Sequence, residues 1–207
     1  NDKKIIQRRI NFARHYLSTD NENILNHKWI IWIMQTHIGQ GVGKYIEEEL
    51  FKTEKYVKVC SPNISYSLSK KLFNLLDNQI KIQVITSDII TGDKNSNQTN
   101  SLAKEILQKN DNIKHNFEYK AISTKDIPLI HAKIYVIDGN CAIIGSANLT
   151  ENSFQNFVEY ILITHEIDLV KKIENDFDKF WIECDSYENQ ITTKSFKKLL
   201  KTLKKKL

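Results

Sequence analysis

Two pairs of polar side chains lie in an otherwise apolar stretch of this sequence: His131 with Lys133, and Ser146 with Asn148. One residue separates the members of each pair. An imidazole can attack phosphorus or transfer a proton near neutral pH, and an ammonium group holds anionic oxygens. The hydroxyl and the carboxamide of the second pair follow a glycine, which permits close approach of the backbone. These residue types at this spacing suit the chemistry of a phosphate group.

A β-hairpin is the element that must position these side chains. Alternation along a strand over residues 129–137 predicts that His131 and Lys133 project from one face and the apolar side chains from the other. Residues 138–140, Asp-Gly-Asn, supply turn chemistry, and a second apolar run follows at residues 141–144. A buried hairpin without a function would leave Lys133 unexplained, because lysine is seldom fully buried unless it is paired.

The same residues form a motif: His131, any residue, Lys133, four residues, Asp138, six residues, then Gly-Ser146-any-Asn148. This motif resembles the signature of the phospholipase D superfamily, and every defined position is filled. The resemblance implies an α/β fold with a mixed, largely parallel β-sheet flanked by helices on both faces, an α-β-α sandwich. It also implies that His131 attacks phosphorus to give a phosphohistidine, while Lys133, Ser146 and Asn148 bind the phosphate. Neither a metal ion nor a cofactor is expected.

Two acidic residues complete the expected site. Residues 157–164 read as a strand that carries Glu159. In the nuclease-like members that the sequence resembles, an acidic residue at about this distance after the motif accepts a hydrogen bond from the catalytic histidine. A carboxylate behind an imidazole orients the ring and stabilises its charged form, so we expect Glu159 to orient His131. Asp138 belongs to the motif, and we assign it a supporting role at the turn.

One copy of the motif occurs in the chain, whereas the enzymes that it resembles use two motifs in each active site. The sequence therefore predicts a homodimer in which His131 of each protomer faces the other across the phosphate. Small single-motif members of the superfamily are mostly nucleases. The leading expectation is a metal-independent phosphodiesterase, most simply an endonuclease that binds and cuts DNA or RNA.

Two other functions compete with this expectation. The first is a phospholipase or phosphatidyltransferase with the same chemistry, working at a membrane. The second is a nucleic-acid-binding module of a larger restriction or defence system, without turnover. A nuclease predicts cleavage that persists in chelator, a lipase predicts head-group release from vesicles, and a binding module predicts binding without turnover.

Composition narrows the class of protein. The chain is 41% hydrophobic with a formal net charge of +5, and no run of eighteen apolar residues occurs. Three widely spaced cysteines lack paired metal-ligand spacing, which favours reduced core thiols in a cytoplasmic protein and makes a zinc site unexpected. The histidines outside the motif also form no ligand spacing, and we expect them to be structural or exposed: His15, His27, His37, His115 and His165.

Three regions are expected along the chain: an N-terminal helix and lead-in over residues 1–40, a catalytic domain over 41–185, and a basic amphipathic helix over 186–207. The lysine-rich last segment fits a packed helix with a solvated face, a nucleic-acid clamp or an interfacial membrane helix. The domain should contain further strands at residues 56–60, 80–86 and 117–122, and helices at residues 44–52, 67–76, 102–108 and 167–181.

Overall fold

The computed structural model describes residues 33–88, 102–103, 105, 115–123 and 130–204, with side chains described as far as residue 186. The chain forms two compact units, residues 1–35 and 36–207, and almost all the described residues belong to the second. Most of the N-terminal helix and lead-in expected over residues 1–40, and most of the helix expected at 102–108, lie outside the described residues.

A seven-stranded sheet forms the centre of the second unit, in the order β1-β7-β6-β5-β2-β3-β4. Parallel pairing joins β2 to β3 and β3 to β4, whereas β2–β5, β5–β6 and β6–β7 pair antiparallel. The predicted mixed α/β sheet is confirmed, but the expectation that it is largely parallel is wrong, because three of these five pairings are antiparallel. The strands are β1 (Met34–Gly39), β2 (Tyr56–Cys60), β3 (Lys81–Asp88), β4 (Phe117–Ser123), β5 (Ile134–Ile137), β6 (Cys141–Gly145) and β7 (Glu159–Thr164).

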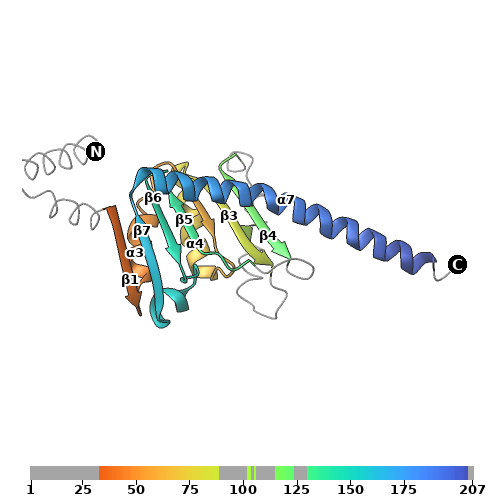
Figure 1. The fold of residues 1–207 in the computed structure, drawn as a ribbon, viewed down its shortest axis with the longest axis horizontal. Coiled ribbons are helices and arrows are strands. Elements are labelled where there is room, and N and C mark those ends of the chain that lie inside the picture. The colour runs from red at the N-terminus through yellow and green to blue at the C-terminus, as the bar shows by residue number, and fades with distance from the viewer. Residues whose placement is uncertain (1–32, 89–101, 104, 106–114, 124–129, 205–207) are drawn as a thin grey trace, which may run out of the picture. The chain divides into compact units, whose positions relative to one another are not determined.

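Helices cover both faces of this sheet, as Figure 1 shows. One face packs against α3 (Gly43–Leu50) and α4 (Tyr66–Phe73), which a 3₁₀ turn, η1 (Asn74–Asn78), extends. The other face packs against α7 (Ile167–Lys204). Strand alternation explains the division, because Tyr135 and Ile137 enter the α3/α4 core while Val136 enters the core under α7.

The predicted hairpin is formed by β5 and β6, with Ile137 opposite Cys141. Asp138 and Gly139 both have positive φ, 52° and 65°, and the amide of Asn140 donates to the carbonyl of Ile137 at 3.1 Å. This is the geometry of a type I′ turn, whose twist matches that of paired strands. However, β5 begins at Ile134 rather than at residue 129, so the His-Lys pair precedes the strand.

Charged side chains hold α7 on the sheet. Lys58 of β2 contacts Asp178 at 2.6 Å and Glu174 at 2.8 Å, and the Tyr56 hydroxyl donates to Glu174 at 2.9 Å. At the far end, Lys120 of β4 pairs with Asp185 at 2.6 Å. The helix continues without a break to Lys204, so the helices expected at residues 167–181 and in the basic tail are one. In the described part of the chain, no helix is long and apolar enough to cross a bilayer.

Candidate active site

One end of the sheet collects most of the predicted site residues. His131 and Lys133 lie in the irregular segment before β5, and Ser146 and Asn148 follow the end of β6. Glu159 is the first residue of β7. Because β6 runs antiparallel to both β5 and β7, the start of β5, the end of β6 and the start of β7 meet at the same end of the sheet. Antiparallel pairing thus brings together residues that are up to 28 positions apart.

His131 and Lys133 do not share an environment, contrary to the expected strand alternation. The His131 side chain is exposed, and its ring makes no hydrogen bond to another described residue. Lys133 is only 5% exposed, and its Nζ donates to the carbonyl of His131 at 2.7 Å. Burial lowers the pKa of Lys133, and the negative charge of Glu159 opposes that shift. An exposed imidazole therefore stands beside a buried, positioned ammonium group.

Glu159 is linked to the site through Ser146. The buried Glu159 carboxylate accepts a hydrogen bond from Ser146 Oγ. Ser146 Oγ in turn accepts a hydrogen bond from the amide of Tyr160 at 3.0 Å. The Ser146 amide donates to the Tyr160 carbonyl at 2.9 Å. Among the described residues, no hydrogen bond joins Glu159 to the ring of His131, the contact that the sequence led us to expect. The geometry gives Ser146 a positioning role, since its hydroxyl is already used within the protein.

The side-chain amide of Asn148 has an oxygen without a hydrogen-bond partner among the described residues. This oxygen, Oδ1, is buried. Buried polar atoms are nearly always paired, so an unpaired one beside charged groups points to a ligand. The amide oxygen and nitrogen can exchange places by rotation of the side chain, which would present a donor to an anion. After that rotation, the amide nitrogen of Asn148 would be able to donate to an anionic oxygen.

Asp138 lies away from these residues. It follows β5, at the other end of the strand, seven residues after His131 and roughly 20 Å away at about 3.3 Å per residue. Partial burial would raise the pKa of Asp138, but hydrogen bonds from the chain at residues 53–56 outweigh it and lower that pKa. The structure thus gives Asp138 a role in holding the fold, and does not place it in the site.

Sequence reasoning missed two residues that fix the loop carrying Asn148. Ser61, fully buried after β2, accepts the amide of Leu149 through Oγ at 3.0 Å and donates to the carbonyl of Asn63 at 2.7 Å. The Tyr135 hydroxyl donates to the carbonyl of Ala147 at 2.9 Å. Nothing in the local sequence indicates that the Ser61 hydroxyl contacts a loop almost ninety residues away.

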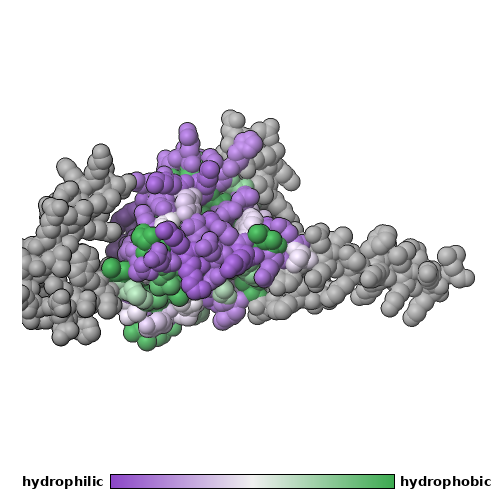
Figure 2. Space-filling model, turned by 45° about the horizontal axis from the view of Figure 1, so that its top comes forward, coloured by the Kyte–Doolittle hydropathy of each residue, from purple (hydrophilic) through white to green (hydrophobic). Residues whose placement is uncertain are grey.

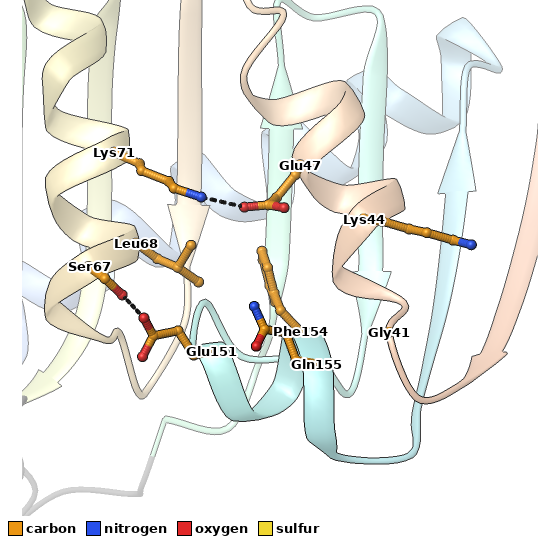
Figure 3. A pocket seen from close by; sticks show the side chains of 9 residues that line it. All are labelled: Gly41, Lys44, Glu47, Ser67, Leu68, Lys71, Glu151, Phe154 and Gln155. Carbon is orange, nitrogen blue, oxygen red and sulfur yellow. Dashed lines mark hydrogen bonds and ion pairs between the residues drawn. The ribbon is translucent and has the colours of Figure 1, made fainter.

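One pocket among the described residues is separate from this site. A pocket of about 330 Å³ opens between α3, α4 and the π-helical turn η2 (Asn152–Asn156), and Figure 3 shows its lining. Within it Lys71 pairs with Glu47 at 3.1 Å, and Ser67 donates to Glu151. His131 and the other motif residues do not line it. Since four of its polar side chains are already paired with one another, we assign the chemistry to the end of the sheet that carries His131.

Ser146→Ala is expected to lower kcat by roughly tenfold to a hundredfold with little change in KM, because misplacement of reacting groups is costly. The loss should come from release of Glu159, which Ser146 holds. Steady-state kinetics on a phosphodiester substrate would measure it. Ser146→Thr, which keeps the hydroxyl, should recover most of the rate. Ser186→Ala, on the exposed side of α7, is the matched control and should change nothing. Equal losses in all three variants would contradict the positioning role.

Comparison with known proteins identifies the fold and the motif. The model of the family described as "Cardiolipin synthase, PLD-like domain" matches residues 46–181, more than half of the chain. Mitochondrial cardiolipin hydrolase from Xenopus laevis is 39% identical over 56 residues, which is 27% of this chain and 27% of that protein. The chain therefore aligns with less than a third of that curated relative's length.

Solved structures share the fold at low sequence identity. Nuc, a phospholipase D family member from Salmonella typhimurium, aligns with a TM-score of 0.55 at 12% identity, covering 72% of this chain and 94% of that one. NucT from Helicobacter pylori gives 0.53 at 16%, covering 70% and 94%. Phosphatidylserine synthase from Haemophilus influenzae gives 0.50 at 14%, covering 71% and 38%. The family match over residues 46–181 includes most of the sheet and the motif. Together with these similarities, it shows that the chain belongs to the phospholipase D superfamily, with the PLD-like domain of phosphodiester-acting enzymes.

Proposed function

We propose that this protein is a metal-independent phosphodiesterase that hydrolyses nucleic acid through a phosphohistidine at a homodimer interface. The observation that carries the proposal is one end of the sheet, where the exposed His131, the buried ammonium of Lys133 and the Asn148 amide with its unpaired Oδ1 are gathered. A nucleophile with two groups for anionic oxygens is what displacement at phosphorus requires.

The reaction proceeds in two steps. A ring nitrogen of His131 attacks phosphorus, a P–N bond forms, and the P–O bond to the leaving group breaks as that oxygen takes a proton from a second imidazole. Water then attacks the same phosphorus, gives its proton to that second imidazole, and the P–N bond breaks. Lys133 and Asn148 hold the non-bridging oxygens in both steps, which stabilises the charge that develops on them.

We assign the second imidazole to a second copy of this chain, because the motif occurs once in the sequence. Apolar side chains stand exposed beside the site: Phe157, Val158 and Tyr160 flank Glu159 with exposed fractions of 55%, 70% and 49%. Exposed apolar groups next to an incomplete site fit a contact with a second copy. Burying them around a twofold axis would bring His131 of the partner subunit toward the phosphate.

Nucleic acid is the substrate class that three of the structural neighbours support. The chain covers 94% of both Nuc and NucT but 38% of phosphatidylserine synthase, so its size matches the former. A further structural neighbour, TrmBL2, is described as an archaeal chromatin protein with a novel mode of DNA binding. The net charge of +5 suits a polyanion. On the face drawn in Figure 2, hydrophilic residues cover most of the described surface, and hydrophobic ones form small groups.

Hydrolysis of phosphatidyl lipids is the second candidate. Its support is the name of the matching family and the similarity to mitochondrial cardiolipin hydrolase over 56 residues. The same His131 chemistry would serve either substrate, because both contain a phosphodiester bond.

The experiment that separates them is turnover by the full chain in excess chelator. Labelled single-stranded and duplex DNA, labelled RNA and cardiolipin-containing vesicles are supplied in parallel. We expect strand cleavage that persists in chelator, with binding that weakens steeply as salt is raised. Lipid hydrolysis without strand cleavage would replace the proposal by the second candidate, and nucleic-acid binding without turnover would make the protein a binding module.

A further inference from the structure

Three side chains of metal-ligand type meet at the opposite end of the sheet from His131. Glu49 lies in the last turn of α3, Cys141 begins β6, and His165 follows β7. Their ligand atoms, a carboxylate oxygen, a sulfur and a ring nitrogen, all lie within 4.8 Å of one another. His165 Nε2 is 3.9 Å from Glu49 Oε1. No spacing in the sequence suggested this cluster, which three separate elements assemble.

Sheet pairing explains why these residues meet. Ala142 of β6 pairs with Thr164 of β7, so the residues just outside that pair, Cys141 and His165, are neighbours across the two strands. Cys141 is buried on the α3 side of the sheet, and its sulfur lies within 4.8 Å of a Glu49 carboxylate oxygen. Glu49 and His165 remain partly exposed, with side-chain exposures of 33% and 20%. The cluster is thus buried at the sulfur and open to water at its outer side.

The orientation of His165 is fixed by a contact outside the cluster. His165 Nδ1 lies 3.2 Å from the carbonyl oxygen of Asn140. A carbonyl can only accept, so Nδ1 carries a proton, and in the neutral ring the lone pair is on Nε2, the nitrogen on the Glu49 side. Metal-binding histidines are commonly held in this way, with the second ring nitrogen donating to a backbone carbonyl.

We propose that Glu49, Cys141 and His165 bind a zinc ion, with water as the fourth ligand. One sulfur, one imidazole nitrogen and one carboxylate oxygen are ligands that zinc takes in tetrahedral sites, whereas magnesium and calcium prefer oxygen alone. At zinc–ligand distances of about 2.0–2.3 Å, ligand atoms lie roughly 3.3–3.8 Å apart. His165 Nε2 and Glu49 Oε1 are 3.9 Å apart and all three ligand atoms lie within 4.8 Å of one another, so binding requires them to close by up to about 1.5 Å. The Cys141 thiol releases its proton to water as the Zn–S bond forms, and the two anionic ligands balance the charge of the ion.

This zinc ion is structural and does not take part in the phosphodiesterase reaction. Cys141 and Ser146 lie five residues apart along β6, roughly 17 Å in an extended strand. The ion instead ties α3 to the ends of β6 and β7. Chelation should therefore lower stability without stopping turnover, and the failure of this site leaves the proposed catalytic function untouched.

The test uses cobalt as a spectroscopic probe and zinc for affinity, on the full chain after removal of metal by chelator and dialysis. Cobalt should give a thiolate charge-transfer band with visible bands of tetrahedral geometry, and zinc should bind one ion per chain. At a hundredfold excess of zinc over its Kd, Tm should rise by roughly 5 °C. These readouts do not depend on activity.

Two variants, each at a partly exposed ligand, test which residues bind zinc. His165→Asn and Glu49→Gln should each weaken zinc binding by at least about tenfold, since loss of even an outer partner of a ligand costs that much. His115→Asn is the control, because that histidine is exposed and outside the cluster. A cobalt spectrum without a thiolate band, or zinc affinity unchanged in His165→Asn, would overturn the proposal. Cys141→Ser is informative only if it folds, and the two other variants suffice if it does not.

Discussion

His131→Ala is expected to lower the rate of phosphodiester cleavage by a factor on the order of 10⁴ or more, because it removes both the nucleophile and its symmetry-related acid. The fold should be unchanged, since the side chain is exposed and its ring makes no hydrogen bond to another described residue. Single-turnover kinetics and circular dichroism would measure the two properties, with His115→Ala as the matched control. Cleavage within tenfold of the wild-type rate would show that His131 is not the nucleophile.

A mixing experiment extends this prediction to the dimer. When His131→Ala protomers are mixed in excess with wild-type protomers and allowed to exchange, each wild-type chain is left with a mutant partner. If one site uses His131 of both subunits, the activity per wild-type chain should fall toward zero as the excess grows. Activity per wild-type chain that stays constant would mean that each chain carries a complete site.

Asp138→Ala should have the largest effect on stability, on the order of 3 kcal/mol. The carboxylate accepts hydrogen bonds at 2.8–2.9 Å from the Thr53 hydroxyl and from the amides of Glu54, Lys55 and Tyr56. Alanine would leave these donors without their acceptor and is also strained at φ 52°. Denaturant unfolding would measure the loss. Asp138→Asn, which tolerates this φ and keeps one acceptor oxygen, should lose clearly less.

The same carboxylate gives the stability a defined dependence on pH. The folded-state pKa of Asp138 is lowered, so its contribution is fully present above the unfolded pKa of about 3.9 and is lost as the pH falls through the folded value. The stability difference between wild type and Asp138→Asn should therefore shrink below about pH 4. A difference that stays constant down to pH 2 would contradict this account.

Local chemistry made the hairpin predictable from sequence. Asp138-Gly139 tolerates the positive φ of a type I′ turn, and the apolar runs on either side fix the two strands. Strand β2 was predicted with its observed bounds for a similar reason, since its alternation is strong and Ser61-Pro62 ends it. These features depend on neighbours in sequence.

Contacts across the sheet could not be predicted from the sequence. The partner of Glu159 is Ser146 rather than His131 because the β6–β7 register sets which side chains meet, and the register is a tertiary property. The burial of Lys133 arises because β5 begins later than its apolar pattern suggested. The cluster around Cys141 needs one helix and two strands to converge, so no spacing in the chain could reveal it.

Trapping the covalent intermediate tests the central claim most directly. Wild-type protein is mixed with a labelled oligonucleotide in excess chelator, quenched within milliseconds in alkaline denaturant, where a phosphohistidine survives, and digested for mass spectrometry. The account predicts a phosphoryl or nucleotidyl adduct on the peptide that contains His131, formed before product and absent from His131→Ala. Strand cleavage that proceeds with no adduct on His131, or that stops in chelator and returns with added magnesium, would contradict it.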